Sequence, residues 1–532
     1  MVNARKLPIG IQDFETIRTG GYVYVDKTEL IYNLVQDGKT YFLSRPRRFG
    51  KSLLVSTLEA YFLGRKDLFA GLAIADKETE WAAYPVLKFS LAGGEFTQEG
   101  GLRMALQSCL SIFEETYGLP SDEPSLPVRF KNALRNAREK TGLRVAVLVD
   151  EYDNPLLKTL GTQPEQYAAQ EQRNRELYKG FFAVLKDCDA YTRFVLFTGV
   201  TKFSKISIFS DLNQLQDISM DEDFAEICGI TQKELERDFV PEIDAMAAEN
   251  GMAREECLAK LKQLYDGYHF AKKSADIYNP FSLINAFKKR DFGKYWFGTG
   301  TPSFLVNRLN SVGFNPKQFS DGSLHTTAEE VSNYRPENPD IVPLLYQSGY
   351  LTIKGYEERR RRYTLGYPND EVKYGFTESL APVYLHNAQG RTGADIFAID
   401  DAIEAGDTDI LREQFTALFA RLPYISAPDA DRLLERDFQN VVYLTFLLLG
   451  QFVQVEQHSA KGRADCIVET ECYVYIFEFK RDGSAEDALA QIEIQGYAVP
   501  YTSDIRTLVK IGVNFDSAER TITGWMVEKE TK

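Results

Sequence analysis

Two short stretches of this sequence carry residues that suit phosphate chemistry, and the first is SRPRRFGKSLL, residues 44–54. It contains Gly50, Lys51 and Ser52, which match the end of the pattern G-x-x-x-x-G-K-[ST], in which backbone N–H groups and a lysine surround a phosphate. The pattern requires a glycine five residues before Gly50, and Arg45 stands there instead. The loop is therefore either a nucleotide site of unusual form or a chance match in a basic turn.

A second motif favours the nucleotide site. In the string VAVLVDEYD, an apolar run is followed directly by Asp150 and Glu151. In P-loop ATPases an acid that ends such a strand supports Mg²⁺, and a neighbouring glutamate can act as general base toward water. We therefore predict Ser52 and Asp150 as metal residues and Glu151 as catalytic, the alternative being two solvated acids. Thr198, at the end of another apolar run, would either sense the γ-phosphate or cap the strand exit.

The second stretch, residues 455–495, places acids where they suit a divalent cation. Asp465 opens the predicted strand ADCIVE, and the next predicted strand ends in Glu478, Phe479 and Lys480. Because side chains alternate faces along a strand, Glu478 and Lys480 share one face, and Asp465 on an antiparallel neighbour can meet Glu478. Two carboxylates suit a hard cation, and a lysine suits the attacking water or the scissile phosphate. The spacing matches the PD-(D/E)xK nuclease core, and the alternative is a surface salt-bridge network.

Two further residues are candidates for that site. Gln491 lies in the following helical segment, at a place where nucleases with this core often carry a glutamine. Glu435, in LLERDFQNVVYL on a preceding helix, would either join the metal site or be an ordinary helix residue. Related sequences often show histidine where Gln439 stands, which leaves chemistry from this helix open.

The elements that must position these residues follow from the apolar patterns. Strand-like runs at 39–44, 84–91, 144–150 and 193–201 alternate with helical segments, and a helix is predicted at 51–64. This alternation predicts a parallel α/β sheet.

The region that follows, 223–390, is predicted to be a helical lid with a winged-helix-like hairpin at 348–368 and a linker. Residues 1–222 are then a P-loop ATPase domain and 391–532 a nuclease-like domain with leading helices. The hairpin carries Arg359 to Arg362, which either contact a DNA backbone or form a solvated turn balanced by Glu357 and Glu358.

Composition narrows the class of protein. The chain has 532 residues with 44% hydrophobic and 26% charged residues, which indicates folded globular domains. A net charge of −15 argues against a surface coated for nucleic-acid binding but allows local basic patches. Six scattered cysteines without a C-x-x-C pair predict no zinc site and a reducing, cytoplasmic compartment. The most apolar stretch, 441–453, is shorter than the ~20 residues that span a bilayer, so no membrane partner is expected.

Six strings together resemble the bacterial AAA-ATPase-like proteins that carry a C-terminal PD-(D/E)xK nuclease-type domain. The strings are LPIGIQDF, YVYVDKT, SRPRRFGKSLL, LVDEYDNPL, FTGVTKFSKISIFSDLNQL and YDGYHF. The resemblance covers most of the chain, and it implies that Arg-Pro-Arg-Arg-Phe-Gly-Lys-Ser is the family's own form of the phosphate loop. The predicted nucleotide-binding residues are Arg47, Arg48, Phe49, Gly50, Lys51, Ser52, Leu53, Asp150 and Thr198. Arg47 and Arg48 either contact phosphate themselves or are structural.

The sequence therefore predicts an ATP-binding protein that couples a P-loop ATPase to a metal-dependent nuclease. The cofactors are ATP and Mg²⁺, with Mn²⁺ as an alternative at the nuclease site. The expected partner is nucleic acid, with DNA preferred, and a homo-oligomer is a further expectation; defence against mobile DNA is a setting suggested by analogy. The alternatives are a nucleotide-dependent DNA-binding or regulatory ATPase with a weak or inactive nuclease-like domain, and an ATP-binding regulator of protein partners.

Overall fold

The computed structural model describes most of the chain in two compact units. The described residues are 5–159, 164–202, 214–297, 305, 319, 324–332, 340–384, 392–419, 441, 445–450, 454–456, 465–519 and 521–530. One unit comprises residues 1–312 and 319–373, and the other comprises residues 313–318 and 374–532. We call them the first and the second unit.

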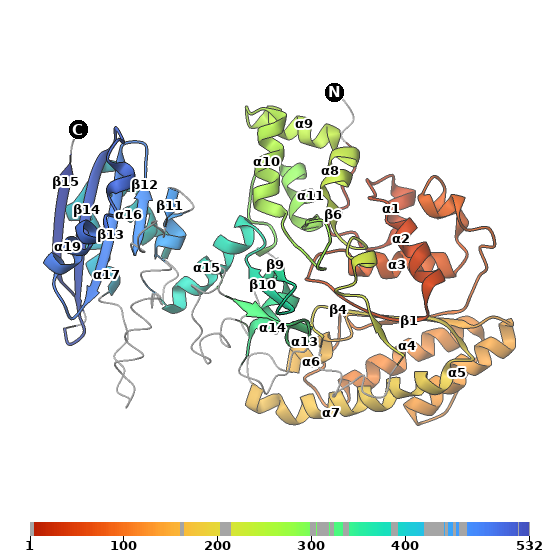
Figure 1. Ribbon diagram of the computed structural model, residues 1–532. Helices are drawn as coiled ribbons and strands as arrows, with labels where there is room; N and C mark the ends of the chain where they lie inside the picture. The colour runs from red at the N-terminus through yellow and green to blue at the C-terminus, as the bar shows by residue number, and fades with distance from the viewer. Residues whose placement is uncertain are drawn as a thin grey trace. The chain divides into compact units, whose positions relative to one another are not determined.

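The first unit is built on a parallel sheet of five strands in the order β2-β3-β4-β1-β5 (Figure 1). Its strands are β1 (Thr40–Ser44), β2 (Val86–Ser90), β3 (Val145–Asp150), β4 (Thr192–Gly199) and β5 (Gln216–Asp217). All six residues of β3 are buried, because helices cover both faces of a parallel sheet. The predicted parallel α/β sheet is confirmed.

Helices lie on both sides of this sheet. In Figure 1, α1–α3 lie above it, and α4, α5 and α7 lie below it. Their bounds are α1 (Phe14–Gly20), α2 (Thr28–Asp37), α3 (Lys51–Phe62), α4 (Gly101–Tyr117), α5 (Leu126–Thr141), α6 (Asn154–Thr159) and α7 (Pro164–Phe182). The helix predicted after the phosphate loop is therefore present as α3.

The rest of the first unit has two parts. The helices α8 (Gln232–Asp238), α9 (Val240–Glu249), α10 (Arg254–Tyr265) and α11 (Pro280–Lys289) share one apolar core, beside the small pair β6 (Ile230–Thr231) and β7 (Ile277–Tyr278). A three-stranded sheet in the order β8-β10-β9 follows, with α13 and α14 between β8 and β9 along the chain. These elements are β8 (His325–Thr326), α13 (Ala328–Ser332), α14 (Val342–Ser348), β9 (Thr352–Glu357) and β10 (Arg362–Gly366). Two helices followed by a hairpin match the predicted winged-helix-like element.

The second unit has a mixed sheet in the order β11-β12-β13-β14-β15. Its strands are β11 (Gln454–Glu456), β12 (Cys466–Glu469), β13 (Tyr473–Arg481), β14 (Thr507–Asp516) and β15 (Thr521–Glu530), and its helices include α16 (Thr392–Ala405), α17 (Thr408–Phe419) and α19 (Ala485–Gln495). Helix α15 spans Asp370–Tyr384.

The central strand β13 buries both of its faces in different cores. Tyr475, Phe477 and Phe479 pack with α16 and α17, whereas Val474 and Ile476 pack with Ile492 of α19. The α/β character predicted for this region is confirmed.

The winged-helix-like part touches the phosphate loop directly. Gly349, which ends α14, has a positive φ of 91°, and a Cβ atom placed on it would lie 2.6 Å from the Cβ of Pro46. A side chain at this position would therefore meet both backbone strain and a collision with the loop.

We expect Gly349→Ala to destabilise the first unit more than Gly142→Ala. Both glycines end a helix in the left-handed conformation, but a Cβ atom at Gly142 meets no atom within 4 Å. The control should cost about 1 kcal/mol from backbone strain alone, and Gly349→Ala should cost more because Pro46 must shift. Differential scanning calorimetry measures both, and equal losses would contradict a tight contact between Gly349 and Pro46.

Candidate functional sites

The loop after β1 presents the open end of α3 to a cavity. Gly50 has a positive φ of 92° and precedes Lys51, and no side chain caps the first N–H groups of α3. Uncapped N–H groups at a helix N-terminus favour anions. Lys51 is 6% exposed, and its Nζ donates to the carbonyl oxygens of Arg45 and Pro46 at 2.9 and 3.0 Å. The loop, Lys51 and the start of α3 therefore lie together, and their binding of a phosphate stays a prediction.

Arg45 explains how the loop folds without its first glycine. Its side chain is 1% exposed and points into the core, where the guanidinium donates to the carbonyl oxygens of Ser44, Ser219, Phe224 and Ala225. It also lies 4.2 Å from the ring centroid of Phe270, and burial lowers its pKa. The Arg45 side chain therefore anchors the loop to the core through these hydrogen bonds.

The acids that follow β3 lie on the other side of the same cavity. This cavity, of about 420 Å³, is lined by Gly50, Lys51 and Ser52 on one side and by Glu151 and Asp153 on the other. Its volume falls within the range of small-molecule sites. Glu151 has a positive φ of 54°, a strained conformation that non-glycine residues keep mainly where the surrounding structure requires it. The structure therefore brings the predicted loop together with Glu151, one of the two predicted acids, at this cavity.

Two of the predicted residues lie behind the cavity wall. Asp150 is buried, and its Oδ1 accepts a hydrogen bond of 2.7 Å from Thr198 Oγ1. Neither of these residues lines the cavity. The structure therefore assigns the Thr198 hydroxyl to holding Asp150, and its predicted contact with a γ-phosphate stays a prediction.

The remaining loop residues lie on two connected recesses. Arg47, Arg48 and Leu53 line the large cavity. Phe49 lines a smaller recess of about 100 Å³ that shares Leu53 with the large one and is otherwise largely apolar. The Phe49 side chain is buried, with its ring 4.7 Å from that of Tyr268, so only its backbone remains available to a phosphate.

Asp153 is a cavity residue that sequence reasoning missed. It is 1% exposed, and its Oδ2 accepts from the backbone N–H groups of Val200 and Thr201 at 3.0 and 2.6 Å. Burial raises its pKa to about 6, although these hydrogen bonds and the charge of Lys51 act in the opposite direction. The only sequence signal was a third acid, two residues after Glu151, in the run DEYD.

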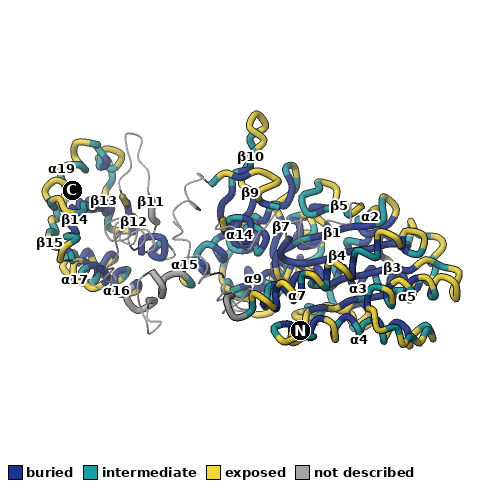
Figure 2. The backbone as a smooth tube through the Cα atoms, turned by 90° about the horizontal axis from the view of Figure 1, so that it is seen from below, coloured by how far each residue is buried: buried dark blue, intermediate teal, exposed yellow. Residues whose placement is uncertain are grey.

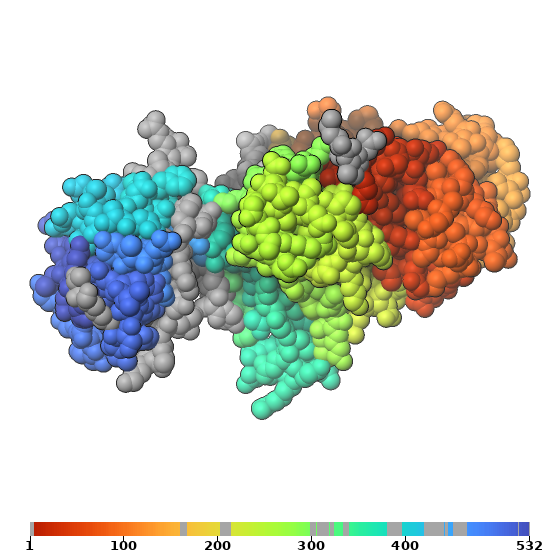
Figure 3. Space-filling model, turned by 90° about the horizontal axis from the view of Figure 1, so that it is seen from above, coloured from red at the N-terminus to blue at the C-terminus, as the bar shows by residue number. Residues whose placement is uncertain are grey.

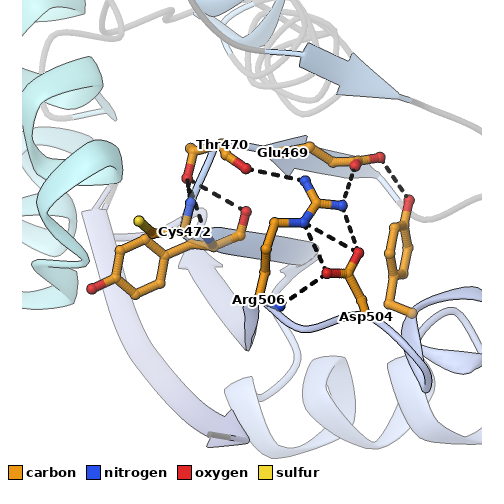
Figure 4. A network of polar contacts seen from close by, with 7 residues as sticks. Glu469, Thr470, Cys472, Asp504 and Arg506 are labelled. Carbon is orange, nitrogen blue, oxygen red and sulfur yellow. Dashed lines mark hydrogen bonds and ion pairs between the residues drawn. The ribbon is translucent and has the colours of Figure 1, made fainter. Parts of the chain in front are cut away.

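The register of β12 against β13 positions the acids of the second unit. Cys466 pairs with Phe477 and Glu469 pairs with Val474, so Asp465 falls beside Glu478. Figure 4 shows what fixes the far end of this hairpin: Arg506 contacts the carboxylates of Glu469 and Asp504 and the carbonyl oxygen of Thr470. These contacts lie at the turn end of β13, away from the predicted site.

The predicted nuclease residues form one cluster. Asp465 Oδ2 accepts from the backbone N–H of Phe479 at 2.8 Å, which holds the aspartate against β13. Lys480 Nζ lies 3.5 Å from Glu478 Oε1 and donates to Gln491 Oε1 on α19. Glu478 and Lys480 therefore share the face of β13 toward α19, as the strand alternation predicts.

Glu478 supplies a test of whether a cation fits this cluster. It is 3% exposed, and its Oε2 is buried without a hydrogen-bond partner. Burial and the neighbouring charge of Asp465 raise its pKa to about 7, and Lys480 acts against this. A buried carboxylate oxygen without a donor, next to a second carboxylate, fits a hard divalent cation.

Two other outcomes concern residues around the second site. Glu435 and Gln439 lie outside the described residues. Tyr497, which was not predicted, is buried beside the cluster: its hydroxyl contacts Gln491, and burial raises its pKa. The turn before it, Gln495-Gly496 at the end of α19, gave no chemical signal in the sequence.

Comparison with known proteins finds two matching domain families. Residues 8–209 match the model of a family described as predicted AAA-ATPase, and residues 433–525 match the PD-(D/E)XK nuclease superfamily. A relative in Azotobacter chroococcum mcd 1, named "Uncharacterized protein in vnfD 5'region", is 38% identical over 542 residues, which cover 99% of each chain. The chain therefore belongs to the family of predicted AAA-ATPase-like proteins with a C-terminal PD-(D/E)XK nuclease domain. In the part of the chain that the structure describes, no helix combines the length and the apolar character needed to cross a membrane.

We expect Asp153→Asn to change how stability depends on pH. Burial raises the pKa of this carboxyl from 3.8 to about 6, so between these pH values the folded protein holds a proton that the unfolded chain has lost. Stability of the wild type should therefore fall as the pH rises through this window, by up to about 3 kcal/mol. The asparagine keeps an oxygen for both N–H groups and does not titrate.

Calorimetry at a series of pH values measures this difference. Asp187→Asn, at an exposed carboxylate of the same unit, is the control and should track the wild type. Parallel stability curves for wild type and Asp153→Asn would show that the carboxyl is not desolvated as the structure indicates.

Proposed function

We propose that this protein binds and hydrolyses ATP in the first unit and cleaves nucleic acid with a metal-dependent nuclease in the second. For the ATPase, the supporting observation is that Lys51 and Glu151 line one cavity at the open end of α3. For the nuclease, it is the partnerless, buried oxygen of Glu478 beside Asp465.

At the first site, the chain's own residues bind and orient the nucleotide. The N–H groups of α3 and the Lys51 ammonium hold the β- and γ-phosphates, and Arg47 and Arg48 add positive charge at the exposed rim. The smaller apolar recess at Phe49 and Leu53 accepts the base. Glu151 takes a proton from the attacking water, and Ser52 with Asp150 would hold Mg²⁺, which offsets phosphate charge.

At the second site, Asp465 and Glu478 would hold Mg²⁺ or Mn²⁺, with Glu435 as a further proposed ligand. A divalent cation bound there would offset the charge of the scissile phosphate and lower the pKa of a bound water. Lys480 then orients the water or stabilises the developing negative charge, and Gln491 fixes the lysine through its hydrogen bond. Asp465 is kept in place by the N–H of Phe479.

The proposal extends to the domain bounds, the substrate and the setting expected from the sequence. We assign residues 1–222 to the ATPase domain, 223–390 to the lid and winged-helix-like region, and 391–532 to the nuclease-like domain. DNA is the proposed substrate and the cytoplasm the proposed compartment. A homo-oligomer and a role in defence against mobile DNA complete the proposal, the latter by analogy.

We expect Lys51→Ala to lose ATP binding, whereas Glu151→Gln binds ATP but hydrolyses it roughly 100-fold more slowly or worse, since a general base contributes at least that much. Binding of a fluorescent ATP analogue and phosphate release measure the two steps. Glu139→Gln, an exposed acid on α5, should behave as the wild type. Unchanged nucleotide binding by a folded Lys51→Ala protein would exclude the proposed phosphate site.

We expect Glu478→Gln to abolish Mg²⁺- or Mn²⁺-dependent cleavage of nucleic acid, because the neutral amide is a poor ligand at the buried position. Cleavage of labelled DNA and RNA, single- and double-stranded, measures this. The matched control is Glu486→Gln at the exposed start of α19, which should cleave normally. If the wild type cleaves none of the four substrates, the alternative of a regulatory ATPase with an inactive nuclease-like domain is supported.

A further inference from the structure

The hairpin of β9 and β10 carries the run of arginines that the two sites do not use. Its residues 352–366 include five basic and two acidic side chains, in a chain whose net charge is −15. Arg359, Arg360 and Arg361 are exposed at the turn, which projects from the body of the first unit (Figures 2 and 3). The turn is therefore a local basic surface on an acidic protein.

The hairpin holds these arginines on a rigid base. Tyr356 and Tyr363 pair across the two strands with ring centroids 4.7 Å apart, and Lys272 lies over the Tyr356 ring at 4.5 Å. Arg361 adopts a positive φ of 51° in the turn. Cross-strand aromatic pairs stabilise a hairpin, and a rigid display reduces the entropy lost on binding.

Internal ion pairs neutralise only part of the charge. Glu357 pairs with Arg360 and Arg362 at 3.0 and 2.7 Å, and Glu358 pairs with Lys272. Among the described residues, neither Arg359 nor Arg361 has an ion-pair partner. The alternative interpretation of the sequence, a solvated turn balanced by acids, therefore accounts for Arg360 and Arg362. It leaves the exposed guanidinium groups of Arg359 and Arg361 available.

The helix α14, next to the hairpin, is not available to contact nucleic acid as the turn is. In helix–turn–helix proteins the second helix enters the major groove, and α14 holds that place here. However, Gln347 of α14 is buried, accepting from the backbone N–H of Lys202 at 2.8 Å and donating to the Val331 carbonyl at 2.9 Å. The N–H of Lys202 follows β4, so α14 packs against the ATPase part. Base edges are then out of reach of α14, while a phosphate backbone is within reach of the turn.

We propose that the turn of this hairpin binds the phosphate backbone of nucleic acid through Arg359 and Arg361, independently of base sequence. This deepens the proposed function, since it names a surface of the first unit for the nucleic acid that the second unit is proposed to cut. Guanidinium groups suit phosphate oxygens because they donate in a fixed fork. Contacts of this kind fix position without reading sequence.

The test is the salt dependence of binding to a labelled DNA duplex, measured by fluorescence anisotropy. The Glu478→Gln protein is the reference, so that no cleavage occurs during the titration. Each phosphate contact contributes about −0.9 to the slope of log affinity against log salt, so adding Arg359→Gln and Arg361→Gln should make the slope shallower by about 2. The loss should be equal for two unrelated duplex sequences.

Two controls separate this from general effects of charge and folding. Lys131→Gln with Arg135→Gln removes two exposed charges from α5, which lies away from the hairpin in Figures 1 and 2, and should keep the slope. Arg359→Lys with Arg361→Lys keeps the charges and should restore most of the binding. A shallower slope in the hairpin glutamine variant alone, with an unchanged melting temperature, supports the proposal.

Three results would overturn it. These are unaltered duplex binding by the hairpin variant, an equal loss in the α5 control, and arginine-dependent binding to phosphatidylserine vesicles but not to duplex. Cleavage by the wild type combined with unaltered binding by the hairpin variant removes the hairpin proposal and leaves the nuclease. Hairpin-dependent binding without any cleavage removes the nuclease and leaves the hairpin proposal.

Discussion

The burial of the Arg45 guanidinium is the interaction on which the first site depends. A buried cation is costly unless its donors are satisfied. Here the two terminal nitrogens of Arg45 donate to four carbonyl oxygens and the ring of Phe270 lies against the guanidinium, whereas Nε has no hydrogen-bond partner among the described residues. These partners come from the preceding residue of β1, from the segment after β5 and from the loop after α10, so the loop adopts its shape only when two distant segments are in place. Lys51 then completes the loop by bonding to the carbonyl oxygen of Arg45 itself. A glycine at position 45 would allow the turn but would supply none of these contacts.

The same part of the fold connects the cavity to the winged-helix-like region. Val200 lines the cavity, the N–H groups of Val200 and Thr201 are held by Asp153, and the next N–H, of Lys202, is held by Gln347 of α14. Pro46 meets Gly349 on the other side. Two non-covalent contacts, the hydrogen bond from Lys202 to Gln347 and the packing of Pro46 against Gly349, therefore link the surroundings of the cavity to α14. A ligand in the cavity shifts α14 only if it binds one arrangement of the segment from Val200 to Lys202 better than another. The contacts of this segment show where such a difference in affinity would act.

Sequence patterns predicted what is local and periodic. The strand β3 and its terminal acids follow from an apolar run, and the shared face of Glu478 and Lys480 follows from strand alternation, as does the pairing that brings Asp465 to Glu478. What the patterns could not give depends on contacts between distant segments. The position of the Arg45 side chain depends on segments near residues 219–225 and 270. The partner of the Thr198 hydroxyl, Asp150, lies on the neighbouring strand. The hydrogen bonds of Asp153 come from a loop almost fifty residues later in the chain.

The second site shows how a fold can keep a group that weakens it. Glu478 lies on the central strand of its sheet, where apolar neighbours would pack without cost, yet its carboxylate is desolvated, close to Asp465 and short of one hydrogen bond. Each of these conditions disfavours the ionised form, and together they raise its pKa and oppose folding. Lys480 relieves only part of this, since its amine also donates to Gln491. A bound cation would satisfy both carboxylates at once, so the features that raise the pKa of Glu478 are those that would make the cluster bind metal well.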